Sequence, residues 1–266
     1  MDNIGKIDKP YIIRISSQKG GVGKTTVSTN LAIALAMSSN RTLIIDADCT
    51  NPAVGFHLGL DQVNMGYGDV VSGRARLSNA TIVHSPSGLK VLPGVIRGTT
   101  HMLTTAQINE FMKKLASTNY DFIIIDTAPG LSPIEPKQLL DEALIITTPD
   151  MASCTSCIRL TTQFNKEKIK HNLIVNRVRN KRYEISTREI EEMYGNRTFG
   201  AIPEDEIVPL SISEHIPAYM LDRRSSFSVT IGEIARLYGS KGGTTIAFRQ
   251  AYTGLVGWFR RLLGLK

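Results

Sequence analysis

The chain has 266 residues, of which 42% are hydrophobic and 21% are charged. This composition excludes a disordered polyelectrolyte and an integral membrane protein, and the length suits one large α/β domain with an appendage, or two small domains. Three cysteines are too few for a disulfide framework, and the polar first ten residues contain no apolar signal segment. We therefore expect a reducing, cytoplasmic location.

The net charge of +7 is unevenly distributed along the chain. All 24 acidic residues, but only 25 of the 31 basic residues, lie at or before Glu233. Residues 1–233 thus carry +1, and the rest of the chain carries +6. A neutral body with a basic tail does not indicate a nucleic-acid-binding surface over the whole protein.

Short β-branched apolar runs followed by helix-compatible segments indicate parallel strands that alternate with helices. Strands are expected at Tyr11–Ser16, Thr42–Asp46, Phe122–Asp126, Leu144–Thr148 and Asn172–Asn176. Helices are expected at Val27–Met37, with one side buried, and at Ile108–Leu115, Ile185–Met193 and Thr230–Tyr238, whereas 205–217 reads as a loop. The pattern predicts an α/β fold, a mostly parallel twisted sheet with helices on both faces, with binding at the carboxyl ends of the strands.

A glycine-rich segment directly after the first expected strand has the features of a phosphate loop. Its glycines let backbone N–H groups turn toward a phosphate, and the helix that follows adds a partial positive charge. Lys24 would neutralise the β- and γ-phosphate oxygens, and the Thr25 hydroxyl would bind Mg²⁺. The segment is Lys19, Gly20, Gly21, Val22, Gly23, Lys24, Thr25 and Thr26. The order of strand, loop, lysine, hydroxyl and helix favours this interpretation over a glycine-rich turn with incidental lysines.

Carboxylates mark the ends of two further expected strands. Asp46 and Asp48 follow one strand, and Asp126 ends another with Gly130 in the loop behind it. A carboxylate at such a position can hold a water of the Mg²⁺ shell. Three carboxylates at matching strand ends favour this interpretation over isolated turn caps.

The pattern Lys-Gly-Gly-x-Gly-Lys-Thr-Thr resembles the deviant Walker A motif of the MinD/ParA family of P-loop ATPases, and the resemblance covers nearly the whole chain. It implies Mg²⁺-dependent hydrolysis of ATP by a homodimer in which Lys19 reaches the nucleotide held by the partner subunit. It also implies that Asp126 is the Walker B aspartate, Gly130 the switch glycine and Asp48 the residue that positions or activates the attacking water. Asp46 would support the metal shell beside Thr25 and Asp126.

Two later segments resemble the loops with which the same family holds adenine and ribose. One contains Asn176 and Arg177, and the other contains Pro203, Glu204 and Asp205. Asn176 has the amide donor and acceptor that the edge of adenine requires, although an asparagine at the end of a strand is also a common turn residue.

The basic tail has the pattern of an amphipathic helix. We expect an ATPase domain at 1–238, a flexible linker at 239–245 and the helix at 246–266. A helical wheel places its rings and leucines on one side, next to a double arginine, and the residues expected at the membrane are Phe248, Tyr252, Leu255, Trp258, Phe259, Arg260, Arg261, Leu262 and Leu263. Only ten uncharged residues separate Arg249 from Arg260, so the helix cannot span a bilayer.

This composition suits a helix that lies among anionic lipid headgroups, and the tail resembles the membrane-targeting helix of MinD proteins. Packing against the body or a partner helix is the alternative. Two tails on an ATP-bound dimer would bind the cytoplasmic face of the cell membrane reversibly and position cellular machinery such as the division site. A regulatory or cargo protein is expected but not identified.

Two other functions stay open. One is a ParA-like ATPase that acts on DNA, although the aromatic residues of the tail favour lipid. The other is a metallochaperone ATPase that uses Cys154 and Cys157, which stand where MinD-like sequences commonly carry an Arg/Asp pair for partner recognition. Two cysteines from each subunit could bind a metal across a dimer, or they are small buried residues at a helix start.

Overall fold

The structure is a computed structural model, and it describes residues 9–60, 63–96, 103–130 and 139–239. The expected membrane-binding helix and residues 240–245 of the expected linker lie outside these ranges. Among the described residues, no helix combines the length and apolarity needed to cross a bilayer.

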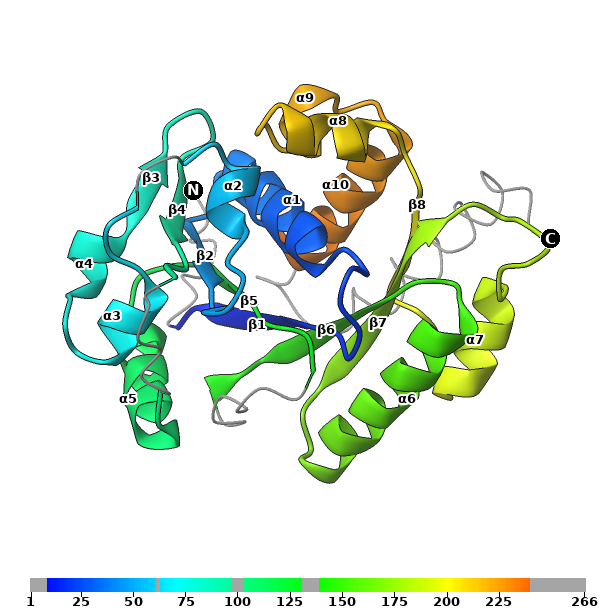
Figure 1. Cartoon of the computed structure of the whole chain (residues 1–266), viewed down its shortest axis with the longest axis horizontal. Helices are drawn as coiled ribbons and strands as arrows, with labels where there is room; N and C mark the ends of the chain where they lie inside the picture. Colours follow the sequence, from blue (N-terminus) through cyan, green and yellow to red (C-terminus); the bar gives the residue numbers. More distant parts are fainter. Residues whose placement is uncertain (1–8, 61–62, 97–102, 131–138, 240–266) are drawn as a thin grey trace, which may run out of the picture.

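The described residues form one eight-stranded sheet with the order β3-β4-β2-β5-β1-β6-β7-β8 (Figure 1). All neighbouring strands are parallel except β3, which runs antiparallel to β4 at one edge. The strands are β1 (Tyr11–Ser16), β2 (Thr42–Asp46), β3 (Ile82–His84), β4 (Leu89–Leu92), β5 (Phe122–Asp126), β6 (Glu142–Thr147), β7 (His171–Val178) and β8 (Gly200–Pro203). The prediction of a mostly parallel sheet with helices is confirmed.

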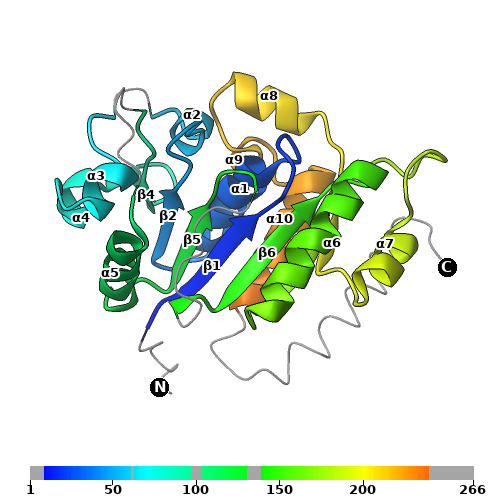
Figure 2. The ribbon, with the colours of Figure 1, turned by 60° about the horizontal axis from the view of Figure 1, so that its bottom comes forward.

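Helices cover both faces of the sheet (Figure 2) because successive strand residues point to opposite sides. In β1, Ile13 and Ile15 pack on the core beneath the first group of helices, whereas Ile12 packs on the second. The first group is α1 (Lys24–Met37), α2 (Val54–His57), α8 (Ile207–Ser213), α9 (Ala218–Leu221) and α10 (Ser226–Gly239). The second group is α3 (Tyr67–Val71), α4 (Leu77–Ala80), α5 (Thr105–Ala116), α6 (Met151–Lys166) and α7 (Thr187–Tyr194).

Helix α1 differs from the expectation of one buried side. Its residues from Thr26 to Leu35 are all buried, because the sheet lies on one side and α9 and α10 lie on the other. It also begins at Lys24, ahead of its apolar pattern. The polar end of the phosphate loop therefore forms the first helical turn.

The prediction of a loop over 205–217 is wrong, because α8 occupies Ile207–Ser213. Pro209 lies in the first turn of α8, where a backbone N–H has no intrahelical acceptor, so proline is compatible with the helix there. The five expected strands are all present, with β6 beginning at Glu142 and β7 running from His171 to Val178, whereas β3, β4 and β8 were not expected. Since the central strands are parallel, their carboxyl ends lie at one edge of the sheet, where the predicted site residues meet.

Candidate active site

The phosphate loop joins β1 to α1 with two glycines in the left-handed region. Gly21 has φ 77° and Gly23 has φ 93°, a conformation that residues with a Cβ rarely adopt. Gly23 immediately precedes α1, and no side chain caps this helix end. The first turn of α1 thus presents backbone N–H groups and a positive dipole end to a ligand.

Three side chains fix this loop to its surroundings. Ser17 Oγ donates to the carbonyl of Lys19 at 2.7 Å. Asn176 Nδ2 donates to the carbonyl of Val22 at 2.8 Å, and Thr25 Oγ1 donates to Asp126 Oδ2 at 2.7 Å. The loop is therefore held at its start, its middle and its end.

Lys24 and Asp126 form the buried charged centre of the site. Lys24 is 7% exposed, and burial lowers its pKa while the charges of Asp126 and Asp48 act in the opposite direction. Burial raises the pKa of Asp126 to about 6, opposed by the Thr25 hydrogen bond, the Lys24 charge and a Ser28 hydrogen bond. The second oxygen of this carboxyl, Oδ1, is buried and accepts no hydrogen bond from the described residues. Such an oxygen beside a threonine hydroxyl fits Mg²⁺ or a water of its shell.

Asp46 lies beside Asp126 in the register of the two strands. Its carboxylate accepts hydrogen bonds from the backbone N–H groups of Asp48 at 3.2 Å, Ala53 at 2.9 Å and Val54 at 3.0 Å. Burial, and then the charge of Asp126, raise its pKa to about 7. Asp46 thus holds the loop that carries Asp48, a role that its spacing in the sequence did not indicate.

Asp48 is 9% exposed and lies near the charged centre. Its Oδ1 accepts hydrogen bonds from the N–H groups of Thr50 at 3.0 Å and Asn51 at 2.9 Å, and from the Thr50 hydroxyl at 2.6 Å. Gly130 has φ 94°, and its N–H donates to the carbonyl of Ser17 at 2.9 Å. Both residues are therefore tied to loops at the same edge as Lys24 and Asp126.

The two expected adenine loops differ in what their polar groups contact. Asn176 is 4% exposed and contacts the phosphate loop, and Arg177 beside it is exposed with φ 59°. Glu204 pairs with Arg179, and Pro203 lies opposite Val178 in the β7–β8 pair. Asp205 accepts hydrogen bonds from Ser226 Oγ, Phe227 N and Ile207 N. The carboxylates of Glu204 and Asp205 thus contact other parts of the protein and stabilise the fold.

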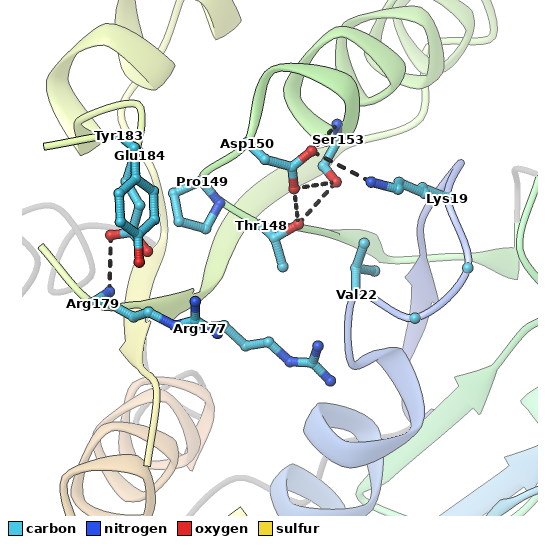
Figure 3. Close-up of a pocket in the computed structure, with 12 residues that line it drawn as sticks. Lys19, Val22, Thr148, Pro149, Asp150, Ser153, Arg177, Arg179, Tyr183 and Glu184 are labelled. Carbon is cyan, nitrogen blue, oxygen red and sulfur yellow. Dashed lines mark hydrogen bonds and ion pairs between the residues drawn. The ribbon is translucent and has the colours of Figure 1, made fainter. Parts of the chain in front are cut away.

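Lys19 points away from the centre of the loop, into an open pocket of about 300 Å³ (Figure 3). Its Nζ lies 3.4 Å from Asp150 Oδ1, and both side chains are about half exposed. The pocket lies between the phosphate loop, the start of α6 and the segment after β7, and its walls include Pro149, Arg177 and Tyr183.

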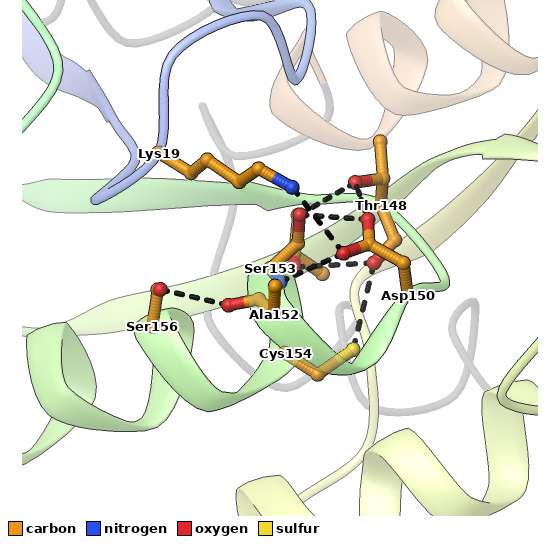
Figure 4. Close-up of polar contacts among 8 residues, drawn as sticks. Lys19, Thr148, Asp150, Ala152, Ser153, Cys154 and Ser156 are labelled. Carbon is orange, nitrogen blue, oxygen red and sulfur yellow. Dashed lines mark hydrogen bonds and ion pairs between the residues drawn. The ribbon is translucent and has the colours of Figure 1, made fainter.

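Asp150 is a residue of this region that the sequence analysis missed. It caps α6 by accepting from the N–H of Ser153 at 3.0 Å, and it also accepts from Thr148 Oγ1 at 2.6 Å and Ser153 Oγ at 2.8 Å (Figure 4). Partial burial opposes its ionisation, but these hydrogen bonds and the charge of Lys19 outweigh that cost and lower its pKa to about 2. Aspartate is a preferred residue directly before a helix, so its position before the Met151–Lys166 segment is a signal that could have found it.

Cys154 and Cys157 lie inside the protein, between α6, α7 and the sheet. They are 3% and 5% exposed and pack with Leu173 and Ile190. Burial raises the pKa of Cys157 to about 12. A metal site shared between two subunits would need thiolates at the surface, and these sulfurs are not presented there.

Comparisons with known proteins agree with this geometry. Residues 10–180 match a protein family described as an AAA domain. A putative septum site-determining protein MinD from Guillardia theta is 34% identical over 218 residues, which cover 77% of this chain and 80% of the relative. The septum site-determining protein MinD of Pyrococcus horikoshii, solved in complex with Mg-ADP, has a TM-score of 0.78 and 28% identity over 85% of this chain and 94% of its own. MinD from Aquifex aeolicus, solved in complex with MinC, has a TM-score of 0.76 and 27% identity over 88% and 97% of the two chains.

Proposed function

Because the chain belongs to the MinD/ParA family of P-loop ATPases, we propose that it binds ATP and Mg²⁺ at the carboxyl edge of the sheet and hydrolyses the nucleotide to ADP and phosphate. One observation carries this proposal. The buried Asp126 carboxyl accepts a hydrogen bond from Thr25 at Oδ2, lies near the charge of Lys24, and has no hydrogen-bond partner for Oδ1 among the described residues. An arrangement that is incomplete without a cation is expected of a binding site and not of a protein core.

Each residue of the site has a separate role in the proposed reaction. The N–H groups of the phosphate loop and the Lys24 ammonium hold the β- and γ-phosphates. The Thr25 hydroxyl and Asp126 would hold Mg²⁺, which supplies charge neutralisation of the phosphate oxygens when it is bound. Asp48 would orient the attacking water, and Gly130 would lie near the γ-phosphate of a bound nucleotide. Asp46 acts on this chemistry indirectly, because it fixes the loop that carries Asp48.

Lys19 supports an ATP-dependent homodimer. Its side chain is half exposed at the outer side of the phosphate loop, and its ion pair with Asp150 is of the exposed kind that contributes about 0–1 kcal/mol. Lys19 can therefore exchange Asp150 for the phosphates of a nucleotide held by the partner subunit at little cost.

The tail supports a peripheral location on the cytoplasmic face of the membrane. It follows α10, where the hydroxyl of Tyr238 donates to Glu142 at the first residue of β6. Helix α10 therefore ends near the amino ends of the strands, opposite the phosphate loop. ATP-driven pairing of two bodies would leave both tails available to lipid, and two weak anchors bind together far more strongly than one.

We further propose that this cycle positions cellular machinery such as the division site, in keeping with the names of the relatives. The Aquifex aeolicus protein was solved with a second protein, MinC. We propose that this chain is likewise recognised by a regulatory or cargo protein.

Phosphate release and co-sedimentation with anionic phospholipid vesicles test these proposals on the full chain. Hydrolysis should require Mg²⁺, and vesicle binding should be greater with ATP than with ADP. Lys19→Ala should bind ATP yet lose the dimer and the ATP-dependent part of vesicle binding. Equal vesicle binding in both nucleotide states, or binding that survives deletion of residues 240–266, would contradict the membrane cycle. A shift of DNA with steep salt dependence would favour DNA as the target instead.

A further inference from the structure

The side chain of Asn176 contacts the phosphate loop from a strand that is not adjacent to β1 in the sheet. Asn176 lies near the end of β7, which is separated from β1 by β6. Its Nδ2 donates at 2.8 Å to the carbonyl of Val22, and the two residues are 4% and 3% exposed. A buried hydrogen bond of this length is not screened by water and fixes the position of its acceptor.

The side-chain amide of Asn176 also lies very close to the backbone of Gly23. A Cβ at position 23 would lie under 3.0 Å from Asn176 Nδ2, which real Cβ atoms essentially never show. Gly23 also has φ 93°, which a residue with a side chain rarely adopts. The absence of a side chain at Gly23 thus serves the contact with Asn176 as well as the turn of the loop.

The geometry of the peptide bond gives this contact a consequence for the ligand. In a planar trans peptide, the C=O of one residue and the N–H of the next point in opposite directions. When Asn176 holds the carbonyl of Val22 on its own side, the N–H of Gly23 is turned to the other side of the loop. Backbone N–H groups turned to one side of such a loop form the cavity that binds an anion.

We propose that Asn176 is a positioning residue that keeps the Val22–Gly23 peptide in the orientation that binds phosphate. The inference rests on the proposed function, since it concerns the same nucleotide site. It differs from the recognition of adenine because its effect does not depend on the base. Loss of the amide should weaken every polyphosphate ligand by the same factor.

Binding of three ligands to the full chain tests this inference. Mg²⁺-ATP, Mg²⁺-GTP and inorganic tripolyphosphate are titrated calorimetrically into the wild type and into Asn176→Ala and Asn176→Ser. Both variants are neutral, so they do not repel phosphate, and the serine is too short to reach Val22. A thermal melt checks that each variant is folded. If one variant fails to fold, the other, which differs in polarity, is used for the titrations.

The matched control is Asn172→Ser, the same substitution in the same strand. Asn172 donates to Glu142 at the opposite edge of the sheet, so this variant should bind all three ligands as the wild type does. In the Asn176 variants, we expect all three dissociation constants to rise about three- to tenfold, which corresponds to the loss of one hydrogen bond, with the ATP-to-GTP ratio unchanged.

The opposite pattern would overturn the inference. If tripolyphosphate binds the Asn176 variants as tightly as it binds the wild type while the preference for ATP over GTP disappears, then Asn176 only reads the base. That result would leave the proposed ATPase intact. A wild type that binds the three ligands but does not hydrolyse ATP would contradict the proposed ATPase and leave this inference standing.

Discussion

Two buried carboxyl groups at opposite ends of the strands differ in how completely the protein satisfies their hydrogen bonds. Asp126, at the carboxyl edge, leaves one oxygen without a hydrogen bond among the described residues. Glu142, at the amino edge, is fully buried and accepts from the hydroxyls of Tyr11 at 2.9 Å and Tyr238 at 3.1 Å. Asn172 also donates to Glu142, and Lys170 Nζ lies 3.5 Å from it.

This difference in hydrogen bonding indicates that Asp126 belongs to a ligand-binding site and that Glu142 stabilises the fold. Burial and the charge of Glu142 raise the pKa values of Tyr11 and Tyr238 far above the usual range, so both phenols stay protonated and remain donors. The Glu142 cluster is complete without a ligand and fixes the end of α10, from which the tail continues. The Asp126 cluster is incomplete, and a cation would complete it.

The largest effect should follow from Asp126→Asn. The substitution keeps the shape of the side chain and an acceptor for Thr25, but it removes the charge that faces the proposed cation. We expect ATP hydrolysis to fall about 10²–10³-fold, as when a preorganised electrostatic group is removed, with a melting temperature close to that of the wild type. Single-turnover phosphate release and a thermal melt measure the two quantities. If Asp126→Asn hydrolyses ATP at the rate of the wild type, Asp126 has no role in the reaction.

Glu142→Ala should show the reverse pattern. It leaves two buried hydroxyls and an amide without their acceptor, so we expect the free energy of unfolding to fall by about 2–4 kcal/mol. The hydrolysis rate per folded molecule should not change. Denaturant unfolding compared with Glu142→Gln, which keeps one acceptor oxygen, isolates the hydrogen bonds. If hydrolysis is lost while Glu142→Ala is fully folded, the two edges are not independent.

Asp150→Ala should have a smaller effect, on stability. Loss of the α6 cap should lower the free energy of unfolding by about 1 kcal/mol at neutral pH. Because the folded-state pKa of about 2 lies below the unfolded value, ionised Asp150 stabilises the fold above the unfolded pKa, and this contribution disappears as the pH falls toward 2.

Urea unfolding of the wild type and of Asp150→Ala from pH 7 to pH 2.5 measures this contribution. The difference between them should be constant above about pH 5 and shrink below it. A difference that stays constant down to pH 2.5 would show that the cap does not depend on the charge.

The sequence predicted the parts of the site that are carried by local pattern. The strands that end at Asp46 and Asp126 match the expected bounds, because each apolar β-branched run stops at a carboxylate. The phosphate loop follows from its own residues.

Asp150 was missed despite its local cap signal, but the other contacts that were missed join distant residues. The hydrogen bond from Asn176 to Val22 spans 154 positions, and the one from Tyr11 to Glu142 spans 131 positions. A glutamate in a fully buried strand also contradicts the apolar pattern by which strands are recognised, so the expected strand began at Leu144 instead. The hydroxyl and amide partners that make such a charge tolerable are visible only once the fold brings them together.

The dependence of ATP affinity on Mg²⁺ tests most directly whether Asp126 Oδ1, which has no partner in the described part of the chain, binds a cation. ATP is titrated into the wild type and Asp126→Asn, with Mg²⁺ and with a chelator in its place. Mg²⁺ should tighten ATP binding in the wild type and have little effect in the variant. An equal gain in affinity from Mg²⁺ in both proteins would contradict this prediction.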